Sequence, residues 1–319
     1  MKKILFILSV AALALVSCNK EQGTGVADGP EFIEFSIDGD LDLSVSTRAS
    51  EVTTDNLANI YVTASKGQQT NSYTGVFQGA TFSKNGSGSS AYWKGDQVWP
   101  SGNTNQYYHF FASNASMSGN GTSSSAVTIA VSGTTGTNSI NTDIVAGSNT
   151  SASWRTRNSL TLGHIFARVN NITVNAPSGY TVSNLKVSFS PITSGTFTVW
   201  SSNSSQSNTW TNRGSASGTN YLLGSQNSGV SISTEGGSAT NTSNDFWIVP
   251  ANTYTLTATY TLSKGSVYSE DFSKTVQNVN FQQGLKNNIT ANLPAGNATD
   301  IEFSVTVSQW NENPITVNF

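Results

Sequence analysis

Several stretches of the chain alternate apolar and polar residues with a period of two, which is typical of β-strands with one buried face. The clearest stretch runs from residue 254 to residue 262, where apolar or aromatic residues alternate with four threonines. Shorter sets with the same period are Ile60, Val62 and Ala64; Val127, Ile129 and Val131; Leu185, Val187 and Phe189; and Ile301, Phe303, Val305 and Val307. We therefore predict an all-β chain.

One of the predicted strands changes parity in its middle. Apolar residues stand at positions 165, 167 and 169, and then at 172 and 174, with Asn170 and Asn171 between the two sets. A β-bulge at the two asparagines would keep all five apolar residues on one buried face.

Long polar stretches separate the predicted strands. Residues 83–90, 113–125, 201–219 and 224–244 are rich in Ser, Gly and Asn, which favours loops and turns. Many antiparallel strands joined by such turns indicate β-sandwiches, and the length suits two domains. A boundary between residues 150 and 160 would divide the chain into an N-terminal domain over 49–158 and a C-terminal domain over 159–319.

The N-terminus predicts a bacterial lipoprotein signal. Met1-Lys2-Lys3 is followed by an apolar run from Ile4 to Val16 and then by Ser17-Cys18. As a helix this run would rise only about 20 Å, too short for a bilayer core of about 30 Å. We expect residues 1–17 to be cleaved and Cys18 to be acylated. Cys18 is the only cysteine, so no intrachain disulfide can form.

Composition and spacing exclude several functions. Charged residues make up 10% of the chain and the net charge is −3, so no basic footprint for nucleic acid is present. His109 and His164 lie inside apolar strands, where structural roles are expected. Asp38, Asp40 and Asp42 resemble the start of a calcium loop but lack its later glycine and glutamate. We predict no catalytic residue, no cofactor and no metal.

Residues 18–48 look like a tether followed by strand-forming sequence. Two alternating sets could each form one face of a strand: Ile33, Phe35 and Ile37, and Leu41, Leu43 and Val45. Ser46-Thr47-Arg48-Ala49-Ser50 follows, and small polar neighbours make Arg48 the sort of exposed site that a protease reaches.

Taken together, the motifs resemble those of the fimbrillin-like proteins of Bacteroidales, the subunits of type V pili. The resemblance is carried by Cys18 and its signal, the Ser-Thr-Arg-Ala segment at Arg48, Val98-Trp99-Pro100 with the aromatic strand Tyr107 to Phe111, Asp143-Ile144-Val145-Ala146, the strand Leu162 to Val169, Ile248-Val249-Pro250, Phe281 to Leu285, and the strand Ile301 to Trp310. These motifs span nearly the whole exported chain.

The resemblance implies two transthyretin-like antiparallel β-sandwich domains in tandem, and lipoprotein transport to the outer membrane and cell surface. It also implies cleavage between Arg48 and Ala49, which removes residues 18–48 with a first strand. The vacated groove then accepts a strand from another fimbrial subunit, and the fimbria supports adhesion to a host protein or glycan. The terminal set Ile315, Val317 and Phe319 is a candidate donor strand, with an apolar face suited to β-strand addition.

Alternatives remain at each step. Arg48 could be an ordinary loop arginine of an uncleaved anchor subunit, and the terminal strand could pair within its own domain. A surface glycan-binding lipoprotein that does not polymerise is the competing function. Trp93, Trp99, Trp200 and Trp210 lie beside polar loops, where exposed rings could stack on sugars, although packing in the core is the commoner role.

Overall fold

The alternating segments of the sequence form strands, and the predicted all-β class is confirmed. The structure, a computed structural model, describes residues 32–38, 41, 51–68, 72–100, 107–133, 140, 142–244, 246–295, 302–309 and 314–315. Across these residues the strands are interrupted by two single-turn 3₁₀ helices, η1 (Gly88–Ser90) and η2 (Ser204–Gln206). No helix in the described part of the chain is long and apolar enough to span a bilayer.

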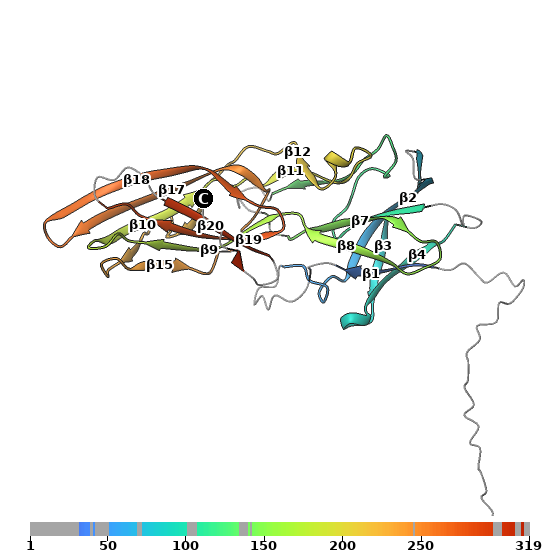
Figure 1. Ribbon diagram of the computed structural model, residues 1–319, viewed down its shortest axis with the longest axis horizontal. Helices are drawn as coiled ribbons and strands as arrows, with labels where there is room; N and C mark the ends of the chain where they lie inside the picture. The colour runs from blue at the N-terminus through green and yellow to red at the C-terminus, as the bar shows by residue number, and fades with distance from the viewer. Residues whose placement is uncertain are drawn as a thin grey trace, which may run out of the picture.

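The N-terminal half forms a closed seven-stranded barrel in the order β1-β4-β3-β2-β5-β7-β8, at one end of the elongated molecule (Figure 1). All of its pairs are antiparallel except β1–β8, a parallel pair that closes the barrel. The strands are β1 (Phe32–Asp38), β2 (Asn59–Gln68), β3 (Ser72–Asn85), β4 (Tyr92–Val98), β5 (Tyr107–Ser113), β7 (Val145–Ala152) and β8 (Asn158–His164).

In the C-terminal half, two sheets contribute to one large buried apolar cluster. Their strands lie at the end of the molecule opposite the barrel (Figure 1). One has the order β13-β10-β17-β18, with β14 also on β10, and the other has the order β15-β9-β19-β20-β21, with β16 also on β9. The strands are β9 (Ala167–Asn175), β10 (Thr181–Phe189), β13 (Asn220–Leu223), β14 (Val230–Ile232), β15 (Ser238–Asn241), β16 (Phe246–Ile248), β17 (Ala251–Lys264), β18 (Tyr268–Phe281), β19 (Leu285–Asn292), β20 (Glu302–Gln309) and β21 (Pro314–Ile315).

A third sheet joins the two halves of the sequence. It has the order β12-β11-β6 and consists of β6 (Val127–Ser132), β11 (Ser194–Trp200) and β12 (Thr209–Thr211). The predicted boundary after residue 158 coincides with the first residue of β8, whose partners β7 and β1 both belong to the barrel. Strand pairing thus groups β8 with the barrel and connects β6 to the later sequence.

The clearest sequence patterns mark buried faces as predicted. The five apolar or aromatic residues of β17 at positions 254 to 262 are each at most 3% exposed. The change of parity in β9 is also explained, because Val169 and Ile172 stand opposite Asn287 and Ile289 of β19. Three steps along β9 therefore match two along β19, which is the bulge expected at Asn170 and Asn171.

Two predictions about the fold need correction. Residues 201–219 and 224–244 are not only loops, because they contain the short strands β12, β14 and β15. Each of these strands has only three or four residues and contains Ser, Thr or Asn, so its apolar alternation is too short to recognise. Backbone pairing with a neighbouring strand, and not an apolar face, makes it a strand. The sheets are also not wholly antiparallel, since β1–β8 and β9–β19 are parallel pairs and the first half is a barrel.

The hydroxyl of Tyr254 in β17 should contribute measurably to the free energy of unfolding, because it bonds two backbone groups. It donates to the carbonyl oxygen of Val249 at 2.7 Å and accepts from the backbone N–H of Ile192 at 3.2 Å. Burial raises the pKa of Tyr254, so the hydroxyl stays protonated. Tyr254→Phe leaves both backbone groups without this partner and should lower the free energy of unfolding by about 1–3 kcal/mol in urea titrations. Tyr61→Phe, at a half-buried tyrosine of β2, is the matched control; equal stability of the two variants would contradict the assignment.

Candidate functional site

Strand β1 is the feature on which a candidate function rests, because it closes the barrel from an unusual position. It pairs antiparallel with β4, with Glu34 opposite Lys94, and parallel with β8, from Phe35 opposite Asn158 to Asp38 opposite Thr161. Its two neighbours in the sheet therefore come about 60 and 120 residues later in the sequence. Without β1, the edges of β4 and β8 would both be unpaired.

The inward face of β1 belongs to the barrel core. Ile33 is 1% exposed and Phe35 is fully buried. The ring of Phe35 contacts those of Phe82 at 5.1 Å and Phe110 at 4.9 Å, both edge to face. Ile37 packs against the same cluster, half-buried. Burying Ile33 and Phe35 contributes roughly 3–6 kcal/mol before entropy is counted, so β1 is a core element whose removal would expose an apolar groove.

The outward face of β1 is held by charge on both sides. The Glu34 carboxylate accepts hydrogen bonds from Arg157 Nη2 at 2.8 Å and Nε at 3.2 Å, and Lys94 Nζ lies 3.7 Å from its other oxygen. Arg157 comes from the β7–β8 connection and Lys94 from β4, so the two cations flank the strand. We call Glu34, Lys94 and Arg157 the carboxylate clamp.

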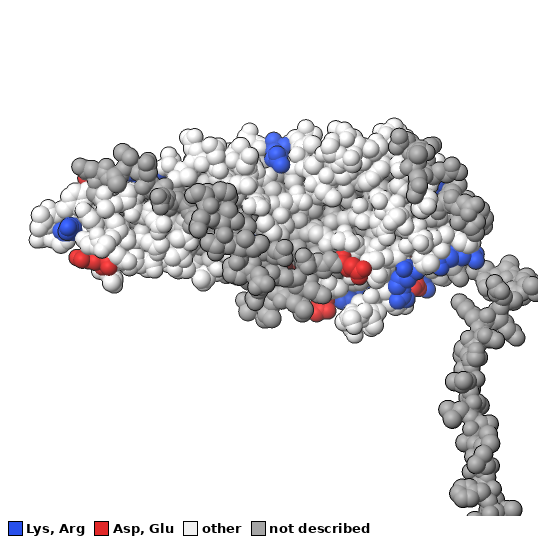
Figure 2. All heavy atoms as spheres, in the orientation of Figure 1, with Lys and Arg blue, Asp and Glu red and all other residues white. Residues whose placement is uncertain are grey.

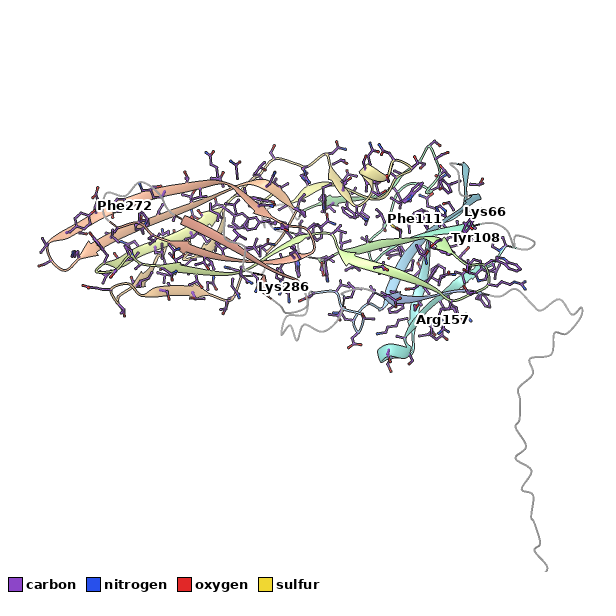
Figure 3. The ribbon with its side chains drawn as sticks, in the orientation of Figure 1. Lys66, Tyr108, Phe111, Arg157, Phe272 and Lys286 are labelled. Atoms are coloured by element: carbon purple, nitrogen blue, oxygen red, sulfur yellow. The ribbon has the colours of Figure 1, made fainter. Side chains whose placement is uncertain are left out.

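Aromatic rings support the cations of the carboxylate clamp. Lys94 Nζ lies 4.6 Å from the ring centre of Phe32, and the Arg157 guanidinium lies 4.2 Å from that of Tyr92. Figure 2 shows Lys and Arg gathered at the barrel end of a face that is otherwise largely uncharged, and Figure 3 labels Arg157 there. Half-exposed ion pairs are worth about 0–1 kcal/mol, so the clamp contributes to alignment more than to stability.

Downstream of β1 the chain is anchored again at Glu51, which is 5% exposed. Its carboxylate accepts from Arg168 Nη1 of β9 at 2.5 Å and lies 3.8 Å from Lys286 Nζ of β19. Val52 N–H donates to Asp143 Oδ2 at 2.9 Å. Glu51 is therefore held by two strands of a C-terminal sheet and Val52 by Asp143, through contacts that do not involve β1.

The remaining residues predicted for the removed strand and the cleavage position precede Glu51 in the sequence. Leu41 is buried, at 2% exposure. Leu43, Val45, Arg48 and Ala49 lie outside the described residues, as does Cys18. The predicted cleavage position therefore falls between two buried points, Leu41 and Glu51.

The candidate donor residues at the C-terminus are only partly described. Ile315 lies in β21, where it stands opposite Val307 of β20 in an antiparallel pair. Val317 and Phe319 lie outside the described residues. Ile315 thus pairs within its own chain in this structure.

The histidines occupy structural positions. His109 is 5% exposed, its ring centre lies 4.4 Å from that of Tyr73, and burial lowers its pKa. His164 Nδ1 lies 2.8 Å from Asp143 Oδ2. Asp38 accepts a hydrogen bond from Ser159 Oγ, whereas Asp40 and Asp42 lie outside the described residues. The described residues contain no group of three His, Cys, Asp or Glu that could hold a metal ion.

The four tryptophans considered as sugar platforms are core residues. Trp93, Trp99, Trp200 and Trp210 are exposed by 9% or less. Trp93 Nε1 donates to the carbonyl oxygen of Leu57 at 3.1 Å, and Trp210 Nε1 donates to that of Ile165 at 2.9 Å. Their rings therefore offer no open face for sugar stacking, and the glycan-binding alternative loses the observation that suggested it.

Sequence reasoning missed the carboxylate clamp and the Glu51 anchor. The signal for the clamp was present, since Glu34 stands between two apolar residues in a chain with only 18 acidic residues. Its partners were not accessible to pattern reading, because Arg157 lies 123 residues away in the sequence. The partners of Glu51 are likewise distant and depend on the parallel pairing of β9 with β19.

A family model described as Fimbrillin-like matches residues 47–310. A fimbrial protein from Bacteroides vulgatus superposes with a TM-score of 0.54 at 15% identity, over 87% of this chain and 99% of that one. A fimbrial assembly protein from Parabacteroides distasonis gives a TM-score of 0.39 at 12% identity, over 90% and 100% of the two chains. The first likeness shows a shared fold, and no curated protein matches the sequence.

The packing of β1 predicts a strong effect of truncating its central side chain. Phe35→Ala should lower the free energy of unfolding by about 3–5 kcal/mol, because it leaves a cavity against Phe82 and Phe110. Chemical denaturation followed by tryptophan fluorescence measures the change. Ser36→Ala, on the outward face of the same strand, should stay within about 0.5 kcal/mol of the wild type; a similar loss in both variants would refute a core role for Phe35.

Proposed function

The chain belongs to the fimbrillin-like family, and we propose that it is a type V fimbrial subunit that polymerises by strand exchange after cleavage at Arg48. The family consists of fimbrial and adhesion proteins and not of enzymes, which places this protein among cell-surface fimbrial components. The observation that carries the finer proposal is the position of β1, which closes the barrel yet precedes Arg48 in the sequence.

Export begins this proposed sequence of events. Residues 1–17 direct the chain to the lipoprotein route, and a lipid on Cys18 holds it at the outer membrane. While tethered, the subunit keeps β1 in its own barrel, so the groove between β4 and β8 is filled. In this self-capped state the apolar groove is not exposed to water, and the subunit does not assemble prematurely.

Cleavage between Arg48 and Ala49 then changes what holds β1. Before the cut, β1 is joined to the barrel through residues 39–58. After the cut, only non-covalent contacts retain it, while Glu51 keeps the new N-terminal region attached to Arg168 and Lys286. A competing strand can replace β1 because its contribution of roughly 3–6 kcal/mol from Ile33 and Phe35 is matched by any strand with a similar face.

The replacing strand comes from the C-terminal part of another fimbrial subunit, for which the sequence suggests Ile315, Val317 and Phe319. Backbone pairing on both sides of the groove and burial of alternate side chains would drive polymerisation. The finished fimbria supports adhesion, with a host protein or glycan as its ligand. We assign two transthyretin-like domains to the subunit and place their junction after β8, because β8 pairs within the barrel.

Blocking the cut should keep the subunit monomeric. Arg48→Ala is expected to yield only lipidated, membrane-bound chains, whereas the wild type gives polymers whose subunits begin at Ala49. Mass spectrometry of the N-terminus and electron microscopy of the cell surface measure both outcomes. Arg213→Ala, at an exposed arginine outside this region, should polymerise normally. Polymers built from Arg48→Ala would show that cleavage is not the switch.

Locking β1 in place should have the same effect after the cut. Glu34 and Lys94 stand opposite each other on adjacent strands, so Glu34→Cys/Lys94→Cys can form a disulfide. The oxidised double variant should be cleaved but remain monomeric, and a reducing agent should restore assembly. Each single cysteine variant is the control. Assembly of the oxidised double variant at the wild-type rate would mean that β1 does not have to leave.

A further inference from the structure

Two hollows meet on the surface where the barrel adjoins the later sheets. One, of about 400 Å³, lies over β7 and β8, and the other, of about 600 Å³, lies beside β12, the start of β17 and the end of β18. Asn208 and Gln283 line both hollows, so the two form one continuous groove, which we call the junction groove. Hollows of this size where domains meet are common ligand sites.

Side-chain amides dominate the lining of the junction groove. They belong to Asn208, Asn252, Asn280, Gln282 and Gln283. Among the described residues none of these amide groups has a hydrogen-bond partner. Each amide offers an acceptor oxygen and two donor hydrogens. A ligand in the groove would therefore displace only water and would not break a bond within the protein.

The charge of the junction groove comes from one arginine. Arg213 follows β12 and is exposed, and it makes no ion pair with any described residue. No aspartate or glutamate is among the residues that line either hollow. A guanidinium in this setting can bind a ligand carboxylate through two parallel hydrogen bonds, and no acidic side chain of the groove would repel that carboxylate.

The walls of the junction groove are fixed by backbone contacts. Trp210 of β12 is bonded to the carbonyl oxygen of Ile165, and the N–H of Gly284 donates to that of Phe166 at 2.8 Å, which holds the turn that carries Gln283. Asn208 has a left-handed backbone with φ of 54°, a conformation that asparagine tolerates better than most residues. Walls held in this way lower the entropy lost when a ligand binds.

The apolar residues of the junction groove offer little surface to a ligand. Leu162, Phe197 and Phe281 line it but are at most 1% exposed. An apolar side chain of a peptide would gain little here, whereas hydroxyl groups, which both donate and accept, match the amides. Gly163 of β8 adds to the free space, because a Cβ atom at this position would meet nothing within 4 Å.

We propose that the junction groove binds an acidic sugar, with the carboxylate on Arg213 and the hydroxyls on the amides around Asn208 and Gln283. The inference rests on the proposed function only for its role, which is to supply the ligand class for adhesion; the binding itself requires neither cleavage nor polymerisation. It needs no open aromatic ring, so it is compatible with the burial of Trp210.

Matched pairs of sugars test the chemical class of the ligand. Calorimetric titration of the uncleaved, detergent-solubilised full chain uses sialyllactose against lactose, and trigalacturonic acid against its methyl ester. At least one acidic sugar should bind about tenfold more tightly than its neutral partner, with a Kd of about 1 mM or below at low salt. Equal affinities within both pairs, or no binding of either acidic sugar, would overturn the inference.

Substitutions in the junction groove test its position. Arg213→Gln should weaken binding of the acidic sugar about tenfold, to the level of the neutral partner. Lys264→Gln, at an exposed lysine of β17, changes the net charge equally and should bind as the wild type does. Unchanged affinity in Arg213→Gln would exclude the arginine as the carboxylate site.

Filling the groove gives a second readout that does not depend on charge. Gly163→Leu places its side chain in open space, so it should abolish binding of the acidic sugar without shifting the urea midpoint of unfolding. Asn208→Gly keeps the left-handed backbone and removes only the amide, so it should weaken binding about fivefold to tenfold. Wild-type affinity in both variants would place the sugar elsewhere and overturn the inference.

The two proposals fail separately. Chains that bind the acidic sugar but never form polymers on cells would support the junction groove and reject the proposed function. Polymers built from chains that bind neither acidic sugar would reject the junction groove as a sugar site and leave strand exchange intact.

Discussion

The barrel depends on one strand that supplies part of its core but is joined to the rest by a single connection. Phe35 fills the space between Phe82 and Phe110, and the backbone of β1 pairs with β4 on one side and β8 on the other. A strand inside a hairpin has a covalent neighbour beside it in the sheet. β1 has neither of its sheet neighbours next to it in the sequence, so the same contacts can be made by a strand from elsewhere.

The anchor at Glu51 gives this arrangement a defined separation point. A buried ion pair is a weak net source of stability, because desolvation offsets much of the attraction, but leaving one charge alone costs about 3–5 kcal/mol. Glu51 and Arg168 therefore make detachment of residues 51 onward unfavourable, while nothing comparable binds β1 to the C-terminal sheets among the described contacts. A cut between Leu41 and Glu51 would separate β1 from the part of the chain that Glu51 holds in place.

Much of the fold could be predicted from the sequence where one face of a strand is buried. The alternation in β17, the bulge in β9 and the inward positions of Ile33 and Phe35 all follow from side-chain burial with period two. Short edge strands such as β12, β14 and β15 could not be found this way, since backbone pairing and not an apolar face defines them. The closure of the barrel by a parallel pair depends on contacts more than 100 residues apart, which periodicity does not encode.

The site was partly predictable for the same reason. Alternation identified β1 as a strand with one apolar face. The tryptophans beside polar loops are nevertheless buried, because ring size and local loop composition say little about exposure. The carboxylate clamp required the structure, since its three residues come from distant segments.

Alternation and the carboxylate clamp constrain register in complementary ways. A slip of one residue turns every side chain of a strand to the opposite face, so it would direct the glutamate toward Phe82 and Phe110 and is excluded by burial. A slip of two residues keeps the apolar face inward and is not excluded by alternation. It moves the carboxylate by about 7 Å along the strand, away from both Lys94 and Arg157. In a chain with 10% charged residues, few other charges could replace those partners, so the clamp is what distinguishes the correct register from its even-numbered alternatives.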